Sequence, residues 1–133
     1  MGVARQIVDI RNAIDAKYPI TIFPEGTTSN GNQLLPFKPS LFAAVAPPPK
    51  QIMIQPVFLD YGHLREALCW VGDESAANNA KRIFARHGSF RVTLNFLAPF
   101  DPVNYADRKA ICAEAEQRMI EALSASMPGR TSI

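Results

Sequence analysis

The chain lacks the features that mark disulfide-rich, metal-binding and membrane-spanning proteins. Its 133 residues include two cysteines, Cys69 and Cys112, which lie far apart and form no C-x-x-C pair. Neither a disulfide framework nor a zinc site is therefore expected, and both side chains are expected to be reduced thiols. No apolar run approaches the length of about 18 residues that a membrane-spanning helix needs, and the N-terminus shows no signal-peptide pattern.

Charge is also scarce. Charged residues make up 20% of the chain and the formal net charge is +2, which gives no electrostatic reason to expect nucleic acid as a partner. The same mild excess is compatible with an anionic membrane surface or an anionic substrate. A hydrophobic content of 47% is typical of a folded globular protein, and the length fits one domain.

The N-terminal part of the chain predicts a helix followed by a strand. Apolar side chains fall on a single helical stripe that includes Val3, Ile7, Ile10 and Ile14. We expect this helix to span residues 3–17, and the apolar run 20–23 to form a buried strand. A helix joined to a strand by a short link is half of a βαβ unit, and no residues of this chain supply the strand before it.

The rest of the chain alternates in the same way. The nearly continuous apolar run over 51–59 predicts a strand covered on both faces, as in a parallel sheet. Pro56 within it indicates a bulge or the strand's end. Period-2 alternation over 90–97 predicts a half-exposed strand near the sheet's edge. Helices are expected over 41–46, 73–86 and 105–125. The predicted class is α/β, an open mixed and mostly parallel sheet flanked by helices.

A polar loop follows the first predicted strand. Pro24 cannot donate to a sheet ladder and should end the strand at Phe23, while Gly26 and Gly31 allow tight turns and close approach of a ligand. The loop contains one carboxylate, three hydroxyls and an amide. Ligands of open α/β sheets bind at the carboxyl ends of strands, so this loop is the predicted binding site.

Three short segments carry a family resemblance. Phe-Pro-Glu-Gly-Thr at residues 23–27, Leu-Pro-Phe-Lys at 35–38 and Ile-Gln-Pro-Val at 54–57 resemble, in order, the third and fourth sequence blocks of the PlsC-like glycerolipid acyltransferases. The resemblance covers roughly residues 18–100. The run Thr-Thr-Ser-Asn-Gly-Asn resembles a bacterial branch of that family that includes lyso-ornithine-lipid acyltransferases.

The resemblance implies transfer of a fatty acyl group from acyl-CoA or acyl-carrier protein to the free hydroxyl of a lysolipid of the 1-acylglycerol-3-phosphate type. It implies a peripheral position on the cytoplasmic face of a membrane and no metal or tightly held cofactor. In the family, the histidine of a His-x-x-x-x-Asp motif is the general base that takes the hydroxyl proton, and the aspartate orients the imidazolium.

The chain departs from the family at this motif. His63 is followed five positions later by Leu68, and His87 by Val92, so no catalytic residue is expected within this chain and both histidines are expected to be surface or packing residues. We expect residues 1–133 to be the C-terminal portion of one acyltransferase domain that lacks its N-terminal strands and is inactive alone. Alternatively, a separate chain supplies the base, or the chain is a non-catalytic lipid- or acyl-binding remnant of the fold.

The resemblance also implies which residues bind. The acceptor site would contain Glu25, Gly26, Thr27, Thr28, Ser29 and Lys38. The acyl-donor groove would contain Pro56 and Val57. Many family members have arginine where this chain has Thr28, which weakens the case for a strictly phosphate-bearing acceptor, because threonine cannot bind two oxygens at once.

Plainer roles remain open for several of these side chains. Glu25 could only accept hydrogen bonds from its own loop, and Lys38 could be a solvated surface residue. Lys81, Arg82 and Arg86 could meet membrane phosphates or form a solvated helix face. A nucleotide phosphate cradle and a serine hydrolase are disfavoured, because the chain has no G-x-x-x-x-G-K-[ST], G-x-G-x-x-G or G-x-S-x-G motif.

Overall fold

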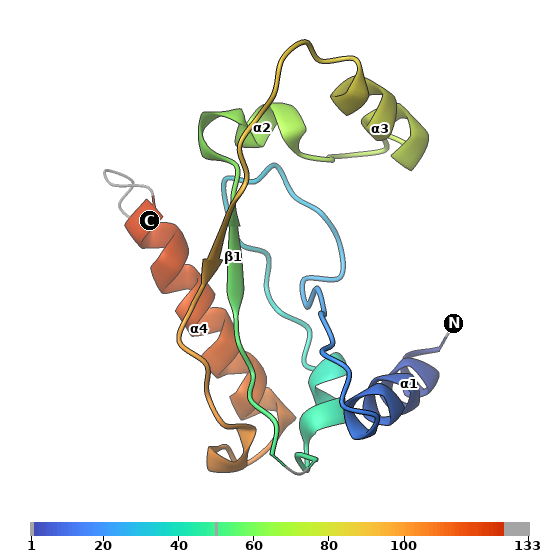
Figure 1. Ribbon diagram of the computed structural model, residues 1–133, viewed down its shortest axis with the longest axis vertical. Helices are drawn as coiled ribbons and strands as arrows, with labels where there is room; N and C mark the ends of the chain where they lie inside the picture. The colour runs from blue at the N-terminus through green and yellow to red at the C-terminus, as the bar shows by residue number, and fades with distance from the viewer. Residues whose placement is uncertain (1, 50, 127–133) are drawn as a thin grey trace.

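The core lies at one end of the molecule, where the long helix α4 (Arg108–Ser126) packs on the short 3-10 helix η1 (Leu41–Val45). The computed structural model describes residues 2–49 and 51–126. The buried cluster contains Phe42, Phe100, Ile111, Cys112 and Ala115. Ile111, only 1% exposed, sits at its centre, and the core occupies the lower end in Figure 1.

The sheet has two antiparallel strands among the described residues. β1 (Val57–Asp60) pairs with β2 (Thr93–Phe96), with Val57 opposite Phe96, and a single bridge between Ile54 and Phe100 extends the pairing toward the core. The α/β class is confirmed. The prediction of a mostly parallel sheet is wrong for the described residues, because an apolar run reports burial of a strand but not the direction of its neighbour.

The strand predicted over 20–23 does not form. This segment pairs with no other strand in the described part of the chain; Ile22 packs against the core, and the Phe23 side chain is 72% exposed. A strand needs a neighbour to satisfy its backbone groups. The strand predicted over 51–59 begins only at Val57, since Pro56 has no N–H to donate to the ladder.

The predicted helices are present with adjusted ends. The helix predicted over 3–17 is α1 (Val3–Asp15), the one over 73–86 is α3 (Ala76–Phe84), and the one over 105–125 is α4. The helix predicted over 41–46 is the 3-10 helix η1. α1 buries none of its side chains fully and is held on η1 by Arg11, whose guanidinium donates to the carbonyl oxygens of Ala44 and Ala43 at 3.2 and 3.3 Å.

The opposite end of the molecule contains η2 (Gly62–Leu64), α2 (Arg65–Leu68) and α3 (Figure 1). Arg82 fastens α3 to the preceding segment. Its guanidinium donates to both Glu74 carboxylate oxygens at 3.1 and 3.0 Å and to the carbonyl oxygens of Ala67 and Cys69. The Ser75 hydroxyl caps the helix by accepting from the N–H of Asn78.

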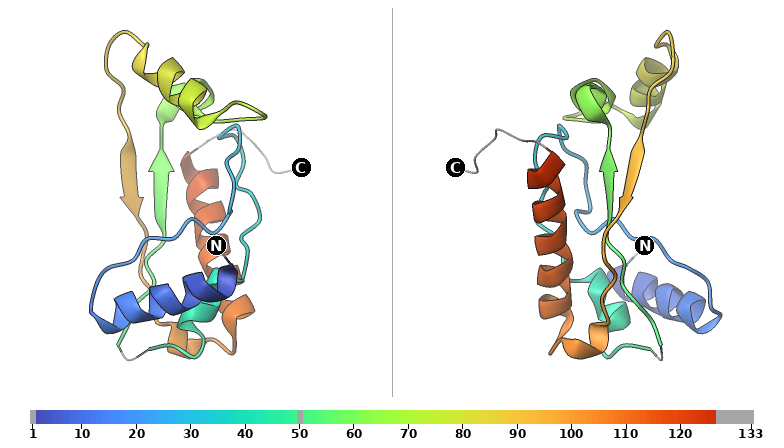
Figure 2. Two further views of the ribbon diagram at one scale, coloured as in Figure 1. Left: turned by 90° about the vertical axis from the view of Figure 1, so that its right-hand side faces the viewer. Right: turned by 60° about the vertical axis from the view of Figure 1, so that its left-hand side comes forward.

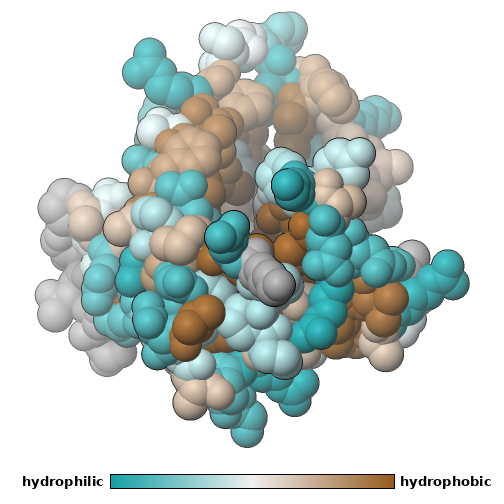
Figure 3. Space-filling model, turned by 60° about the horizontal axis from the view of Figure 1, so that its bottom comes forward, coloured by the Kyte–Doolittle hydropathy of each residue, from teal (hydrophilic) through white to brown (hydrophobic). Residues whose placement is uncertain are grey.

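Much apolar surface is left open. α4 runs along one side of the β1–β2 pair (Figure 2), where Phe58 is buried, whereas all four residues of β2 are exposed. Seen from the core end, apolar surface lies in a hollow between more hydrophilic side chains (Figure 3). The 3-10 helix η3 (Pro102–Asn104) leads into α4. None of the helices within 2–49 and 51–126 has the length and apolar character needed to cross a bilayer.

Candidate functional site

The segment that should end a strand forms a β-turn. The N–H of Gly26 donates to the carbonyl oxygen of Phe23 at 3.2 Å, which places Pro24 at the second position, where its fixed φ is favourable, and Gly26 at the fourth, where glycine is common. Gly26 has φ +69°. The chain returns to this turn at Lys38, whose N–H donates to the carbonyl oxygen of Pro24 at 2.8 Å.

The Lys38 side chain lies directly over Gly26. A β-carbon at Gly26 would be 3.0 Å from Lys38 Nζ and 3.2 Å from its Cδ, which is closer than ordinary van der Waals contact. Glycine is therefore needed here for two reasons, the positive φ and the close approach of Lys38. Behind Lys38, the N–H of Phe37 donates to Glu116 of α4 at 3.3 Å, so the lysine extends from an anchored backbone.

Glu25 is half-buried and uses one carboxylate oxygen within the loop. Its Oε2 accepts from the N–H of Leu35 at 2.8 Å, which is the plainer role considered from the sequence. Among the described residues, no hydrogen bond reaches its second oxygen, Oε1. The carboxylate is thus fixed in position by one oxygen and has the other available for a ligand.

The hydroxyls that follow differ in their availability. Ser29 is committed to the loop, because its Oγ accepts from the N–H of Gly31 at 3.2 Å and donates to the carbonyl oxygen of Gln33 at 3.3 Å. Thr27 and Thr28 are exposed. Within the described part of the chain neither threonine hydroxyl makes a hydrogen bond, so both can bind a ligand.

The far end of the loop presses on α2. Gly31 has φ +75°, and a β-carbon there would lie 2.5 Å from Cys69 Sγ. Burial raises the pKa of the Cys69 thiol, against the lowering effect of Arg65 and Arg82, so this side chain is a packing residue and not a reactive thiolate. The contact brings the loop to the carboxyl end of β1.

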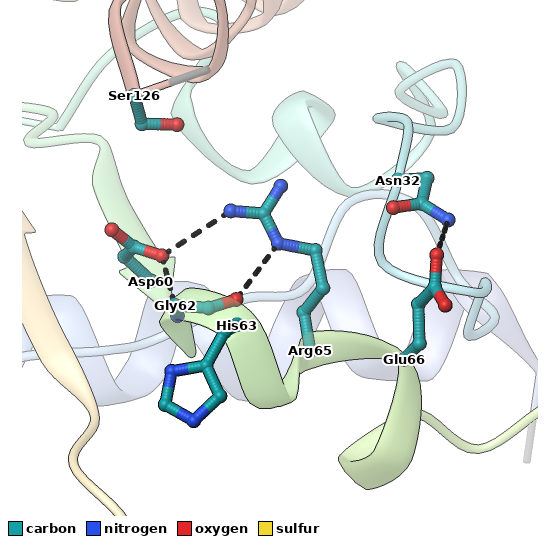
Figure 4. Close-up of a pocket in the computed structure, with 7 residues that line it drawn as sticks. All are labelled: Asn32, Asp60, Gly62, His63, Arg65, Glu66 and Ser126. Atoms are coloured by element: carbon teal, nitrogen blue, oxygen red, sulfur yellow. Dashed lines mark hydrogen bonds and ion pairs between the residues drawn. The ribbon is translucent and has the colours of Figure 1, made fainter.

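An open pocket of about 550 Å³ lies at that end. Its lining, drawn in Figure 4, comprises Asn32, Asp60, Gly62, His63, Arg65, Glu66 and Ser126. Arg65 forms an ion pair with Asp60 at 3.5 Å, and Asn32 donates to Glu66 at 2.7 Å. The His63 ring points away from the Asp60–Arg65 pair (Figure 4).

The sequence prediction named none of these lining residues as ligands. The signal that could have found Asp60 and Arg65 is the one that located the first loop: they follow the carboxyl end of a strand. No cluster of potential metal ligands occurs among residues 2–49 and 51–126.

Pro56 and Val57 lie apart from this pocket, at the start of β1. Pro56 is buried, and its carbonyl oxygen accepts from the N–H of Leu97 at 3.0 Å. Val57 opposes Phe96, and Leu59 opposes Leu94. These four apolar side chains share one face of the sheet, which is the face opposite the buried Phe58. The structure therefore brings Glu25, Gly26 and Lys38 together and places the predicted donor residues on a separate apolar face.

Comparison with known proteins supports the interpretation of these segments. The family model described as Acyltransferase matches residues 2–60. The chain is 31% identical to a lyso-ornithine lipid O-acyltransferase of Brucella abortus (strain 2308) over 94% of this chain and 52% of the relative. It is 30% identical to the enzyme of the same name from Rhizobium meliloti (strain 1021), over 95% of this chain and 48% of the relative.

A human relative, lysophosphatidylcholine acyltransferase 1, is 32% identical over 88% of this chain and 21% of its own length. No solved structure matches the chain. The chain spans about half the length of the lyso-ornithine lipid acyltransferases it matches. The turn, its returning lysine and these relatives define an acyltransferase domain of the lysolipid-acylating class. The chain belongs to the PlsC-like glycerolipid acyltransferase family.

Proposed function

We propose that this chain takes part in moving a fatty acyl group from acyl-CoA or acyl-carrier protein to the free hydroxyl of a lysolipid, and that it supplies the acceptor site. The observation that carries the proposal is the position of Lys38, whose ammonium is held against Gly26 and directly beside Glu25 in the sequence block that the family shares. A fixed cation next to a fixed carboxylate suits a polar lipid headgroup.

Each available group has a proposed role. Lys38 and the exposed hydroxyls of Thr27 and Thr28 bind the anionic part of the headgroup, while Glu25 Oε1 accepts a hydrogen bond from a hydroxyl or amine of the acceptor. Gly26 allows the headgroup to approach the backbone, and Ser29 keeps the loop in shape. A lone lysine and two hydroxyls bind an anion less rigidly than an arginine fork does, which favours an acceptor of the lyso-ornithine-lipid type over lysophosphatidate.

The acyl donor is proposed to lie along β1. Its thioester end approaches Pro56 and Val57, and its acyl chain lies on the open apolar face, where Leu94 and Phe96 are 54% and 64% exposed. Burial of this face by an acyl chain is favourable because it removes apolar surface from water. A position on the cytoplasmic face of a membrane follows from a lipid acceptor and a soluble acyl donor.

The proton-accepting base is proposed to come from outside residues 1–133, either from an upstream segment of the same protein or from a separate chain. This polypeptide alone would then not turn over substrate. In the complete site a base takes the proton of the acceptor hydroxyl, the oxygen attacks the thioester carbonyl, and the thiol leaves with a proton. Neither histidine of this chain is followed five positions later by aspartate, which supports this division of roles.

Binding of a lysolipid to the full chain, measured below the lipid's micelle concentration, tests the proposal. Lys38→Ala should weaken binding about fivefold to tenfold, as expected for loss of one charge-assisted contact. Lys109→Ala, an exposed lysine of α4 outside the loop, is the matched control and should bind like the wild type. Equal affinities of Lys38→Ala and the wild type would contradict the proposed acceptor site.

The absence of the His-x-x-x-x-Asp motif favours one alternative, a lipid-binding remnant without catalytic function. An acyl-transfer assay with and without an added segment that carries the motif separates the two. Transfer that appears only with the added segment supports the enzyme, whereas lysolipid binding without transfer under both conditions supports the remnant.

A further inference from the structure

The stretch from Ser75 to Phe100 is uniformly cationic. It contains Lys81, Arg82, Arg86 and Arg91 and not a single aspartate or glutamate. The chain as a whole has a net charge of only +2, so this segment carries a local positive excess that the rest of the chain largely offsets. In the structure it forms α3 and the connection from α3 to β2, at the end of the molecule far from the core (Figure 1).

The same end exposes large apolar side chains. Phe84, the last residue of α3, is 87% exposed, the largest value among the exposed large hydrophobic residues of the described part of the chain. Phe90 is 41% exposed. A phenylalanine so far out of the protein makes no contribution to the core, and its exposure to water is unfavourable unless something covers it.

α3 has two faces with different tasks. Arg82 points toward the body of the protein and is occupied by Glu74 and two carbonyl oxygens. Lys81 and Phe84, three positions apart, are neighbours on the helix surface, with Phe84 nearly opposite Arg82. Ion pairs within the described residues involve none of Lys81, Arg86 and Arg91, all of which are exposed. The helix is thus anchored by one face and presents a cation and an aromatic ring on the other.

We propose that this end of the molecule docks on an anionic lipid bilayer. The docking surface, here named the basic tip, comprises Lys81, Phe84, Arg86, Phe90 and Arg91. The aromatic side chains enter the region between headgroups and acyl chains, and the cations lie at the lipid phosphates. Charge complementarity identifies the occupant, because exposed aromatics ringed by cations without any carboxylate match an anionic, apolar-cored surface.

The location of the basic tip deepens the proposed function, on which this inference rests. The acceptor loop reaches the same end, since Gly31 lies against Cys69, next to α2 and the open pocket. A lysolipid in the docked bilayer would therefore meet the loop by moving within the membrane, without crossing water. The bilayer both holds the protein and delivers the substrate.

Vesicle flotation tests the inference directly. The full chain is mixed with phosphatidylcholine vesicles, with or without phosphatidylglycerol, at low and high salt. Binding should require phosphatidylglycerol and fall with salt. Each basic side chain should contribute about fivefold to the partition constant, so reversal at Lys81, Arg86 and Arg91 (K81E/R86E/R91E) should reduce binding more than a hundredfold. Phe84→Ser should reduce it about tenfold.

Matched controls come from other parts of the surface. Val103→Ser removes a side chain that is 66% exposed in η3, at the core end. The triple reversal R5E/R108E/K109E changes three exposed cations of α1 and α4. Both controls should bind vesicles within about twofold of the protein with their net charge restored by salt matching, and circular dichroism should show all variants folded. Equal losses in the basic-tip and control triples would overturn the inference.

Two further outcomes are also decisive. Equal binding to vesicles with and without phosphatidylglycerol would overturn the role of the cations. If Phe84→Ser abolished self-association in sedimentation but left vesicle binding unchanged, the exposed ring would be a contact between two copies, and the inference would fail. Micelle-free lysolipid binding separates this inference from the proposed function: the basic-tip variants should retain it, whereas Lys38→Ala should lose it and still float with vesicles.

Discussion

The substitution Gly26→Ala separates the two reasons for glycine in the acceptor turn. The new β-carbon would meet strain from φ +69° and, at 3.0 Å from Nζ, would displace Lys38. The backbone strain of a left-handed alanine is about 1 to 2 kcal/mol. Displacement of a flexible lysine end adds little to the unfolding free energy, but it moves the ammonium from its position beside Glu25.

Gly72 provides a matched control within the same chain. Its φ of +64° is nearly the same, and a β-carbon there would have nothing within 4 Å. Gly72→Ala should therefore lower the free energy of unfolding by a similar amount, about 1 kcal/mol after allowance for the stiffer unfolded chain, and should leave lysolipid binding unchanged. Gly26→Ala should lower both, with binding weakened about fivefold.

Urea denaturation measures the first quantity, and titration with a lysolipid below its micelle concentration measures the second. The comparison is informative because only the contact with Lys38 differs between the two glycines. If Gly26→Ala and Gly72→Ala had the same lysolipid affinity, the placement of Lys38 over Gly26 would have no part in acceptor binding, and the reasoning would be refuted.

Three other predictions concern the surrounding structure. Gly31→Ala should destabilise the chain by more than Gly26→Ala, because its β-carbon would meet Cys69 Sγ at 2.5 Å; adding Cys69→Ala should recover part of the loss in urea denaturation, and no recovery would contradict the contact. Ile111→Ala should cost about 3 kcal/mol of unfolding free energy, since the side chain is 1% exposed in the core; a cost below about 1 kcal/mol would place the core elsewhere. The hydrogen bonds from Arg82 lower the pKa of Glu74 in the folded protein, so its contribution to stability is present above the ordinary glutamate pKa and is lost as pH falls through the lower folded value. The difference in melting temperature between wild type and Glu74→Gln should shrink over that acidic range, and a difference independent of pH would argue against the pair.

The sequence predicted the local structure better than the long-range pairing. The helical stripe of α1 and the period-2 alternation of β2 depend on neighbours along the chain, and both elements form where expected. The segment 20–23 has the composition of a strand, yet a strand exists only with a partner, and within the described residues none lies beside it. Similarly, the apolar run before Asp60 could not report that its neighbour β2 runs antiparallel.

The candidate site divides in the same way. Pro24 and Gly26 were predictable as a turn because their backbone preferences are local. The return of Lys38 to that turn and the hydrogen bond from Leu35 to Glu25 depend on how a loop folds back on itself, which no residue pattern encodes. The pocket beside Arg65 depends on the meeting of the loop with α2, a contact between segments distant in the sequence.

Photo-crosslinking tests the central claim most directly. A lysolipid with a photoreactive group in its headgroup would be irradiated with the full chain, and the labelled residues would be located by mass spectrometry. The account predicts labels within residues 24–29 and at Lys38, with competition by unlabelled lysolipid. Labels confined to other segments, with none in that turn, would contradict it.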